Sequence, residues 1–291
     1  MQTVVTHNGN FHPDDVFALA TLQLHLGKEN IKVIRTRDEE IIKSADWVVD
    51  VGEVYDVEAK RFDHHQKGSP ERDNGIPYAA FGLVWKELGV QVCGSEEVAT
   101  FIEEKLAQPI DAGDNGVSLY SLNEYEVKPF ELFSVVHTFK PVWGSDDNVD
   151  DKFLEAVDFA RGLIERLVAS SKAGEVMMKI IEDGYNNAED KSIIVYEESI
   201  NRHALVKYEE PKLVVFKSES SGEVRWKAET VPVDYNTFDS RVDFPAEWGG
   251  LRDEELVEAS GIEDAVFCHK GNFLFVAKTK EGAIAAAKMA K

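Results

Sequence analysis

The chain of 291 residues carries 54 acidic and 32 basic side chains, giving a net charge of −22, and 43% of its residues are hydrophobic. This composition predicts a soluble protein of two domains, and the acidity argues against membrane surfaces and long nucleic-acid duplexes as partners. Two cysteines, Cys93 and Cys268, exclude a disulfide framework and a cysteine zinc site, and without a signal or transit pattern we expect a cytoplasmic protein.

Strand and helix signals alternate in the first part of the chain. Strand signals over residues 3–6, 31–34 and 47–51 predict short strands, and residues 60–63 are predicted to be short and extended. Helical spacing, with Pro13 and Ser95 as start signals, predicts helices over residues 13–26, 38–44, 78–88 and 95–108. Repeated β-α-β units of this kind predict a mostly parallel sheet covered by helices.

A long helical pattern follows at residues 150–183, and strand signals dominate after it. Strands are expected over residues 193–196, 204–208, 213–217 and 224–231, then a helix over 253–260, a hairpin over 265–278 and a closing helix from Glu281. We therefore predict an α/β fold with a metal-binding catalytic domain (1–150), a helical connector (151–186) and a smaller C-terminal α+β substrate-binding domain (187–291). The connector is also a candidate dimer helix, so a homodimer stays open.

Histidines and aspartates follow the predicted strands or a helix of the first domain, and open α/β sheets bind ligands at the carboxyl ends of their strands. A lone His or Asp there is usually a cap or a surface group, and acids beside Pro13 also favour a helix N-terminus. Taken together, the set predicts a site for two metal ions. Mixed imidazole and carboxylate ligands favour Mn²⁺ or a related transition ion over Ca²⁺. The candidates are His7, His12, Asp14, Asp50, Asp63, His64, His65 and either Asp111 or Asp114.

The triplet Asp63-His64-His65 matches the signature of the DHH phosphoesterase superfamily. Across essentially the whole chain, longer segments resemble the Myg family, which is described as a DHH-type exonuclease. In chain order these are THNGNFHPDDVFALATL, DVGEVYD, RFDHHQKG, YAAFGLVWKELG, DAGDNG and WGGLRDEEL. The first motif departs from the usual superfamily pattern, because His12 stands where an Asp is common and one residue is inserted.

The resemblance implies roles for individual residues. His65 would polarise the phosphate or assist the leaving group, and either Asp63 or Asp50 would bridge the two ions. The implied metal ligands are His7, His12, Asp14, Asp50, Asp63, His64 and Asp111, with Asp114 as the alternative to Asp111.

In DHH enzymes a C-terminal domain closes over the metal centre and contacts phosphate through a glycine-rich segment. The usual Gly-Gly-Gly-His run is absent here. Trp248 either stacks a base or packs a tight turn, and Cys268 is expected in the core. The nearest candidates for substrate binding are Gly249, Gly250, Arg252, His269 and Lys270.

The leading hypothesis is phosphodiester hydrolysis by a hydroxide that two metal ions activate, with Asp63 and His65 as catalytic residues. We expect Mn²⁺, with Mg²⁺ or another divalent ion as the alternative, and single-stranded RNA or short oligonucleotides as substrates degraded from an end. The exonuclease activity rests on the resemblance. The first alternative is hydrolysis of pyrophosphate, a nucleoside bisphosphate or a cyclic dinucleotide. The second is a non-enzymatic, metal-stabilised interaction module built on the 150–183 helix.

Overall fold

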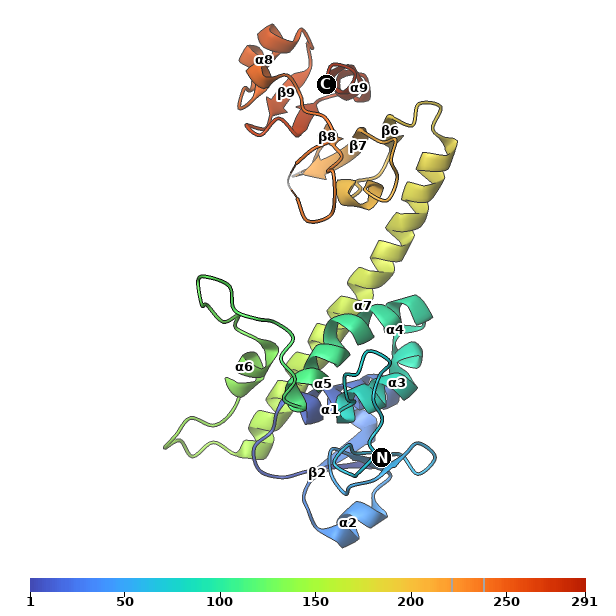
Figure 1. Ribbon diagram of the computed structural model, residues 1–291, viewed down its shortest axis with the longest axis vertical. Coiled ribbons are helices and arrows are strands. Elements are labelled where there is room, and N and C mark those ends of the chain that lie inside the picture. The colour runs from blue at the N-terminus through green and yellow to red at the C-terminus, as the bar shows by residue number, and fades with distance from the viewer. Residues whose placement is uncertain (221, 238) are drawn as a thin grey trace. The chain divides into compact units, whose positions relative to one another are not determined.

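The computed structural model describes residues 1–220, 222–237 and 239–291, and its chain divides into two compact units (Figure 1). Unit 1 is Met1–Lys172 and unit 2 is Ala173–Lys291. One helix, α7 (Val149–Asn187), continues from the first unit into the second without a break at Gly174. The domain boundaries inferred at residues 150 and 186 stay a prediction.

Unit 1 contains a five-stranded mixed sheet in the order β2-β1-β3-β5-β4. Parallel pairs join β1 to β2, β1 to β3 and β3 to β5, whereas β4 runs antiparallel to β5. The central strands are short apolar runs, typical of parallel strands covered on both faces. The strands are β1 (Gln2–Thr6), β2 (Ile31–Arg35), β3 (Trp47–Val49), β4 (Tyr55–Asp56) and β5 (Arg61–Phe62).

The predicted helices of unit 1 occur in the predicted order, but the helix expected over residues 78–88 continues to Cys93, and Leu132–His137 is a helix that the sequence does not predict. Residues 96–114 form a nearly continuous helical path that includes a π-helical turn (Glu103–Ala107) and reaches Asp114, beyond the predicted end at residue 108. The elements are α1 (Pro13–Leu26), a 3₁₀ turn (Lys28–Asn30), α2 (Glu39–Ser44), α3 (Ala80–Cys93), α4 (Glu96–Ile102), α5 (Gln108–Asp114) and α6 (Leu132–His137).

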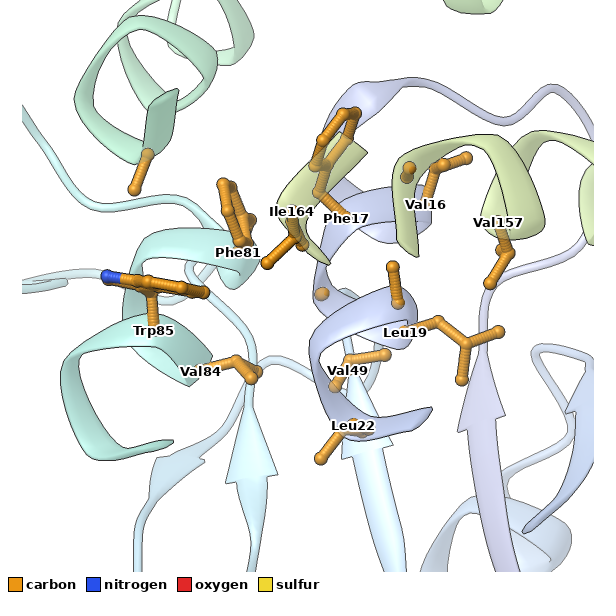
Figure 2. Close-up of a cluster of buried hydrophobic side chains, with 14 of the residues drawn as sticks. Val16, Phe17, Leu19, Leu22, Val49, Phe81, Val84, Trp85, Val157 and Ile164 are labelled. Carbon is orange, nitrogen blue, oxygen red and sulfur yellow. The ribbon is translucent and has the colours of Figure 1, made fainter. Parts of the chain in front are cut away.

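The core of unit 1 forms where α1, α3 and α7 meet β3. Figure 2 shows Phe17 of α1 and Phe81 of α3 in this cluster, with Val49 of β3 and Ile164 of α7. All four side chains are buried, and burial of apolar surface at this scale is the main stabilising term of folding. The packing fixes the first turns of α1 and α3, which carry or hold residues of the site described below.

Unit 2 contains a second mixed sheet in the order β6-β7-β8-β10-β9. β6 and β7 are parallel and the other neighbours antiparallel, including the predicted hairpin of β9 and β10. The elements are β6 (Ile193–Tyr196), a 3₁₀ turn (Arg202–Leu205), β7 (Leu213–Ser220), β8 (Glu223–Thr230), a 3₁₀ turn (Ala246–Trp248), α8 (Asp253–Ser260), β9 (Ala265–Cys268), β10 (Leu274–Ala277) and α9 (Lys280–Ala287).

The α/β class is confirmed, and one predicted strand is wrong. Residues 204–208 begin within a 3₁₀ turn because the Asn201 side chain accepts the N–H of His203 at 3.0 Å and starts the turn. Among the described residues, no helix has both the length and the apolar character needed to cross a bilayer.

Candidate metal centre

The candidate metal centre lies in unit 1, at the carboxyl ends of three neighbouring strands. His7 follows β1, Asp50 follows β3, and Asp63 and His64 follow β5. Because β1 pairs with β3 and β3 with β5 in parallel, the three strand ends lie at the same edge of the sheet. The first turn of α1 and the last residue of α5 complete the cluster.

Asp50 occupies the centre of the cluster, is only 1% exposed, and lies among four histidine rings. Its Oδ2 atom is 3.3 Å from Nε2 of His7 and 3.4 Å from Nε2 of His12. Its Oδ1 atom is 3.7 Å both from Nε2 of His64 and from Nδ1 of His65. The backbone of Asp50 is left-handed, with φ of 54°, a strained conformation that clusters at functional sites. With its oxygens turned to different histidines, Asp50 belongs to two of the groups of atoms that could hold a metal ion.

His7 is oriented by its neighbours on both ring nitrogens. Nδ1 lies 3.1 Å from the carbonyl oxygen of Asn8, so that donation to this carbonyl leaves Nε2 to face the cluster. Nε2 is 3.2 Å from Oδ2 of Asp15, whose Oδ1 accepts the backbone N–H of His12 at 2.9 Å. Asp15 was not among the metal ligands predicted from the sequence. The signal that finds it is its place three residues after His12, where an acid turns back to the helix N-cap.

Asp63 organises the loop that follows β5. Its Oδ1 atom accepts the backbone N–H of His64 at 2.7 Å and lies 2.6 Å from Nδ1 of His65. Its Oδ2 atom accepts the backbone N–H of Glu53 at 2.6 Å. Burial alone would raise the pKa of Asp63, but the hydrogen bonds from His65 and Glu53 lower it below its usual range. Asp63 is therefore an ionised carboxylate that fixes the His65 ring.

Asp114, at the end of α5, reaches the cluster with both carboxylate oxygens. Oδ1 lies 3.1 Å from Nδ1 of His12, and Oδ2 lies 3.2 Å from Nε2 of His64. Burial opposes ionisation, but the imidazoles of His12 and His64, which lie close to its two oxygens, hold the pKa of Asp114 well below its usual range. The structure thus brings Asp114, the sequence's alternative to Asp111, into a group of possible ligand atoms with His12 and Asp14.

Asp111 lies one turn earlier on α5 and has different partners. Its Oδ2 accepts from Nη2 of Arg72 at 2.7 Å, and its Oδ1 accepts the backbone N–H of Gly82 at 3.0 Å. A methyl group at Gly82 would overlap the Asp111 carboxylate, so the glycine permits the close approach of α3 and α5. Asp111 belongs to none of the groups of possible ligand atoms that the described residues form, and its observed partners are Arg72 and the backbone of Gly82.

Asp14 is fully buried and holds the N-terminus of α3. Its oxygens accept the backbone N–H groups of Ala80 at 2.9 Å and Phe81 at 2.6 Å, as a carboxylate does at a helix N-terminus. Burial first, and then repulsion from Asp50, raise the pKa of Asp14 well above its usual value. Oδ2 also lies 3.8 Å from Nε2 of His64, so one side chain links α3 to the cluster.

The donor atoms of this cluster fit divalent metal ions. Among the described residues, ligand-type atoms form three groups within 4.8 Å, namely His7, His12, Asp15 and Asp50; Asp50, Asp63, His64 and His65; and His12, Asp14 and Asp114. Several buried atoms have no hydrogen-bond partner there: Nε2 of His7 and His64, Nδ1 of His12, Oδ2 of Asp15 and both oxygens of Asp50. Buried polar atoms without a partner destabilise the fold unless a cation binds to them. The mixture of imidazole and carboxylate ligands suits a transition-metal ion.

The histidines of the cluster carry raised pKa values in the metal-free chain. Burial opposes protonation of His7, but Asp15 and Asp50 outweigh it and raise its pKa to about 10. Burial likewise opposes protonation of His64, yet Asp114 and Asp50 raise its pKa to about 10. The negative charges of the cluster therefore attract protons strongly, as they would attract a divalent cation.

The predicted substrate-binding residues lie close together in unit 2. The backbone N–H of Gly250 donates to Cys268 at 3.0 Å, and a Cβ at Gly249 would lie 3.3 Å from the carbonyl oxygen of Lys270. The guanidinium of Arg252 lies 4.2 Å from the centroid of the Phe267 ring. His269 is half-buried, with Nδ1 accepting the N–H of Gly271 at 3.0 Å.

Trp248 is 1% exposed and packs 5.5 Å from the ring of Phe275, so the expectation that it stacks a base is wrong. Its alternative, a packed turn, is the one the structure shows. Cys268 is fully buried, as expected of a core residue.

Known proteins match this chain over nearly its whole length. The family model MYG1_exonuc, described as Uncharacterised protein family (UPF0160), matches residues 3–290. The human protein named MYG1 exonuclease is 30% identical over 322 residues, covering 97% of this chain and 84% of that protein. The MYG1 protein of Dictyostelium discoideum is 30% identical over 324 residues, covering 97% and 94%.

Among solved structures, the pGpG-specific phosphodiesterase PggH from Vibrio cholerae covers 95% of this chain and 92% of its own at 12% identity. Its TM-score of 0.31 is too low to support a statement about this chain. The family model spans residues 3–290, which include every residue of the candidate metal centre, and each of the two curated relatives covers 97% of the chain. The chain belongs to the MYG1_exonuc family.

Proposed function

We propose that this chain is a DHH-type, metal-dependent phosphodiesterase that degrades single-stranded RNA or short oligonucleotides from an end. The observation that carries the proposal is the position of Asp50 between two groups of ligand atoms, which suits two neighbouring cations. The relatives named MYG1 exonuclease support the nuclease class. The sequence Asp63-His64-His65, at the carboxyl end of β5, supports the DHH type.

The residues of the cluster divide into two sets around Asp50. His7, His12 and Asp15 would hold one ion, and His64 with Asp114 and Asp14 would hold the other. Bound ions, which we take to be Mn²⁺ with Mg²⁺ as the alternative, supply Lewis acidity toward the phosphate and lower the pKa of water. Asp50 would keep the two sets at a fixed separation, because both of its oxygens are buried between them.

His65 is the side chain best placed to move a proton. It is 57% exposed at the edge of the cluster, and its Nδ1 atom is held 2.6 Å from Asp63. Nε2 is thus the nitrogen that would deliver a proton to the leaving oxygen, with the ring orientation set by Asp63. Arg252, His269 and Lys270 of unit 2, with the backbone at Gly249 and Gly250, would bind substrate phosphate.

A second candidate is hydrolysis of a small phosphate compound, such as pyrophosphate or a cyclic dinucleotide. A cavity of about 740 Å³ adjoins Asp50, Asp63 and His65, and its wall includes Arg37 and Lys43. This volume lies in the range of small-molecule sites, and of these two cations Arg37 is the one that would face a phosphate, since Nζ of Lys43 lies 3.4 Å from Oε2 of Glu39.

The test presents Mn²⁺-loaded protein with labelled RNA, single-stranded DNA, dinucleotides and pyrophosphate in one assay. The proposal predicts stepwise shortening of the single strands and loss of this activity in Asp63→Ala. Rapid cleavage of pyrophosphate with RNA left intact would favour the second candidate. Full hydrolysis of RNA by Asp63→Ala would refute the proposed mechanism.

A further inference from the structure

An aromatic pocket opens beside the candidate metal centre in unit 1. Its volume is about 510 Å³, and its lining includes Phe130, Phe133, His137 and Lys140. His12 also lines this pocket, while its Nε2 atom lies 3.4 Å from Oδ2 of Asp50. The pocket and the metal cluster therefore share a wall, and a ligand whose phosphate reaches the cluster would have its next group in the pocket.

The pocket is anchored to the cluster through α6 and α5. The ring of Phe133 packs directly against Gly113, where a methyl group would collide with it, and Gly113 precedes Asp114 in the chain. Val136 of α6 is fully buried in the core of unit 1. The α6 part of the wall, which includes Phe133, is thus held beside the cluster by packing on both sides.

Two rings of the pocket are exposed to solvent and are not part of the hydrophobic core. Phe130 is 73% exposed, and His137 is also exposed. Flat rings together with a cation are the side chains that bind single-stranded nucleic acid, since the rings stack on bases and the cation faces the backbone. Lys140 supplies that cation, with Nζ 5.9 Å from the ring centroid of Phe11. A phosphate alone would leave this aromatic surface uncovered.

We propose that the aromatic pocket binds a nucleobase of the substrate, with Phe130 as the stacking ring, next to the phosphate at the metal cluster. The inference rests on the proposed function and narrows it, because it assigns the site to substrates that carry a base. Stacking of one base on an aromatic side chain corresponds to at least about a fivefold gain in affinity. Phe130 thereby fills the role that the buried Trp248 does not have.

The experiment compares two probes that the enzyme does not cleave as diesters. Binding of AMP and of ribose 5-phosphate to the Mn²⁺-loaded full chain is measured by calorimetry for the unmodified protein, Phe130→Ala and Trp143→Ala. Trp143 is the matched control because it is an aromatic residue of the same segment, is 98% exposed and does not line the pocket. We expect AMP to bind about tenfold more tightly than ribose 5-phosphate, an advantage lost in Phe130→Ala and kept in Trp143→Ala.

Equal binding of the two probes by the unmodified protein, absence of binding by both, or an AMP advantage that survives in Phe130→Ala would each overturn the inference. A Phe130→Ala variant with lower oligomeric mass and an intact AMP advantage would identify the surface as an interface between copies instead. The proposed function is tested by a different measurement. A chain that binds AMP more tightly than ribose 5-phosphate but hydrolyses no oligonucleotide would keep the base pocket and contradict the nuclease activity.

Discussion

Oδ2 of Asp114 lies 3.2 Å from Nε2 of His64, so the end of α5 reaches a loop that follows β5, fifty positions earlier in the chain. Asp111, three residues before it, instead accepts from Arg72 at 2.7 Å. Two aspartates of one short helix thus have separate tasks, one at the candidate metal centre and one in the packing of α5. The first two predictions separate these tasks.

Asp114→Asn should weaken Mn²⁺ binding by about tenfold or more, because the amide lacks the charge that faces His12 and His64. Its thermal unfolding without metal should also occur at a lower temperature, because the ionised carboxylate pairs with His12 and His64 in the folded chain and its lowered pKa reports that stabilisation. Calorimetric titration of Mn²⁺ measures the first quantity and differential scanning calorimetry the second. Unchanged Mn²⁺ affinity in Asp114→Asn would remove this residue from the ligand set.

Asp111→Asn should destabilise unit 1 by about 1–3 kcal/mol, because it removes one of the two carboxylates that pair with the buried Arg72 guanidinium, whose Nε keeps Glu103 at 2.6 Å. Urea unfolding measures the loss. The matched control is Lys28→Gln, which breaks an ion pair with Asp158 of similar length, 2.6 Å, whose side chains are 52% and 45% exposed. That exposed pair should contribute less than about 1 kcal/mol. Equal losses in the two variants would contradict a structural role for Asp111.

Metal ions should raise the melting temperature of the chain, because they would bind buried imidazole nitrogens and carboxylate oxygens that lack hydrogen-bond partners. At a free Mn²⁺ concentration of a hundred times Kd, the gain is about 2.7 kcal/mol. Asp50→Asn should lose most of it while keeping its fold, since asparagine tolerates the left-handed backbone at this position. A thermal shift with Mn²⁺ and with EDTA measures the effect, and an equal Mn²⁺ shift in Asp50→Asn would place the bound ion elsewhere.

The metal-induced shift should grow as the pH rises from about 6 to about 9. Without metal, His7 and His64 have pKa values raised to about 10, so both hold a proton across this window. An incoming ion must displace these protons, and the displacement costs more at low pH. Thermal shifts in matched buffers measure the trend. A shift independent of pH would mean that these imidazoles do not bind the ion.

The sequence predicts the edge of the sheet at which the cluster forms, because His7 and Asp50 each follow a short strand with apolar residues and Asp63 follows a short extended segment. Parallel strands bring such residues together irrespective of side-chain detail. Asp111 and Asp114 are one turn apart on a helix, and their difference depends on Arg72, which is 39 residues from Asp111 in the chain. Local patterns contain no signal for such a partner, so the choice between the two aspartates needs the fold.

Burial is the second property that local patterns leave undetermined. Trp248 stands in a glycine-rich segment that suits a binding loop, yet it packs against Phe244 and Phe275 in the core of unit 2. Phe130 stands in a segment without clear helix or strand signals and is 73% exposed. The two rings differ in the packing around them, which arises from distant elements.

His65→Gln should lower kcat by about 10²–10⁴-fold and leave Mn²⁺ affinity nearly unchanged. The side chain is 57% exposed, so its replacement should cost little stability. The test combines steady-state kinetics on a single-stranded substrate with Mn²⁺ titration. A variant that loses metal binding together with kcat would show that His65 acts as a ligand and not as the proton donor.

The most direct test of the central claim is the initial rate of single-stranded RNA hydrolysis as a function of Mn²⁺ concentration, measured for the unmodified chain and for Asp50→Asn. A metal centre that depends on Asp50 predicts a rate that rises with Mn²⁺ and falls to background with EDTA in the unmodified chain. It predicts near-background rates in a folded Asp50→Asn at every concentration. Hydrolysis that persists in EDTA, or that Asp50→Asn retains in full, would contradict it.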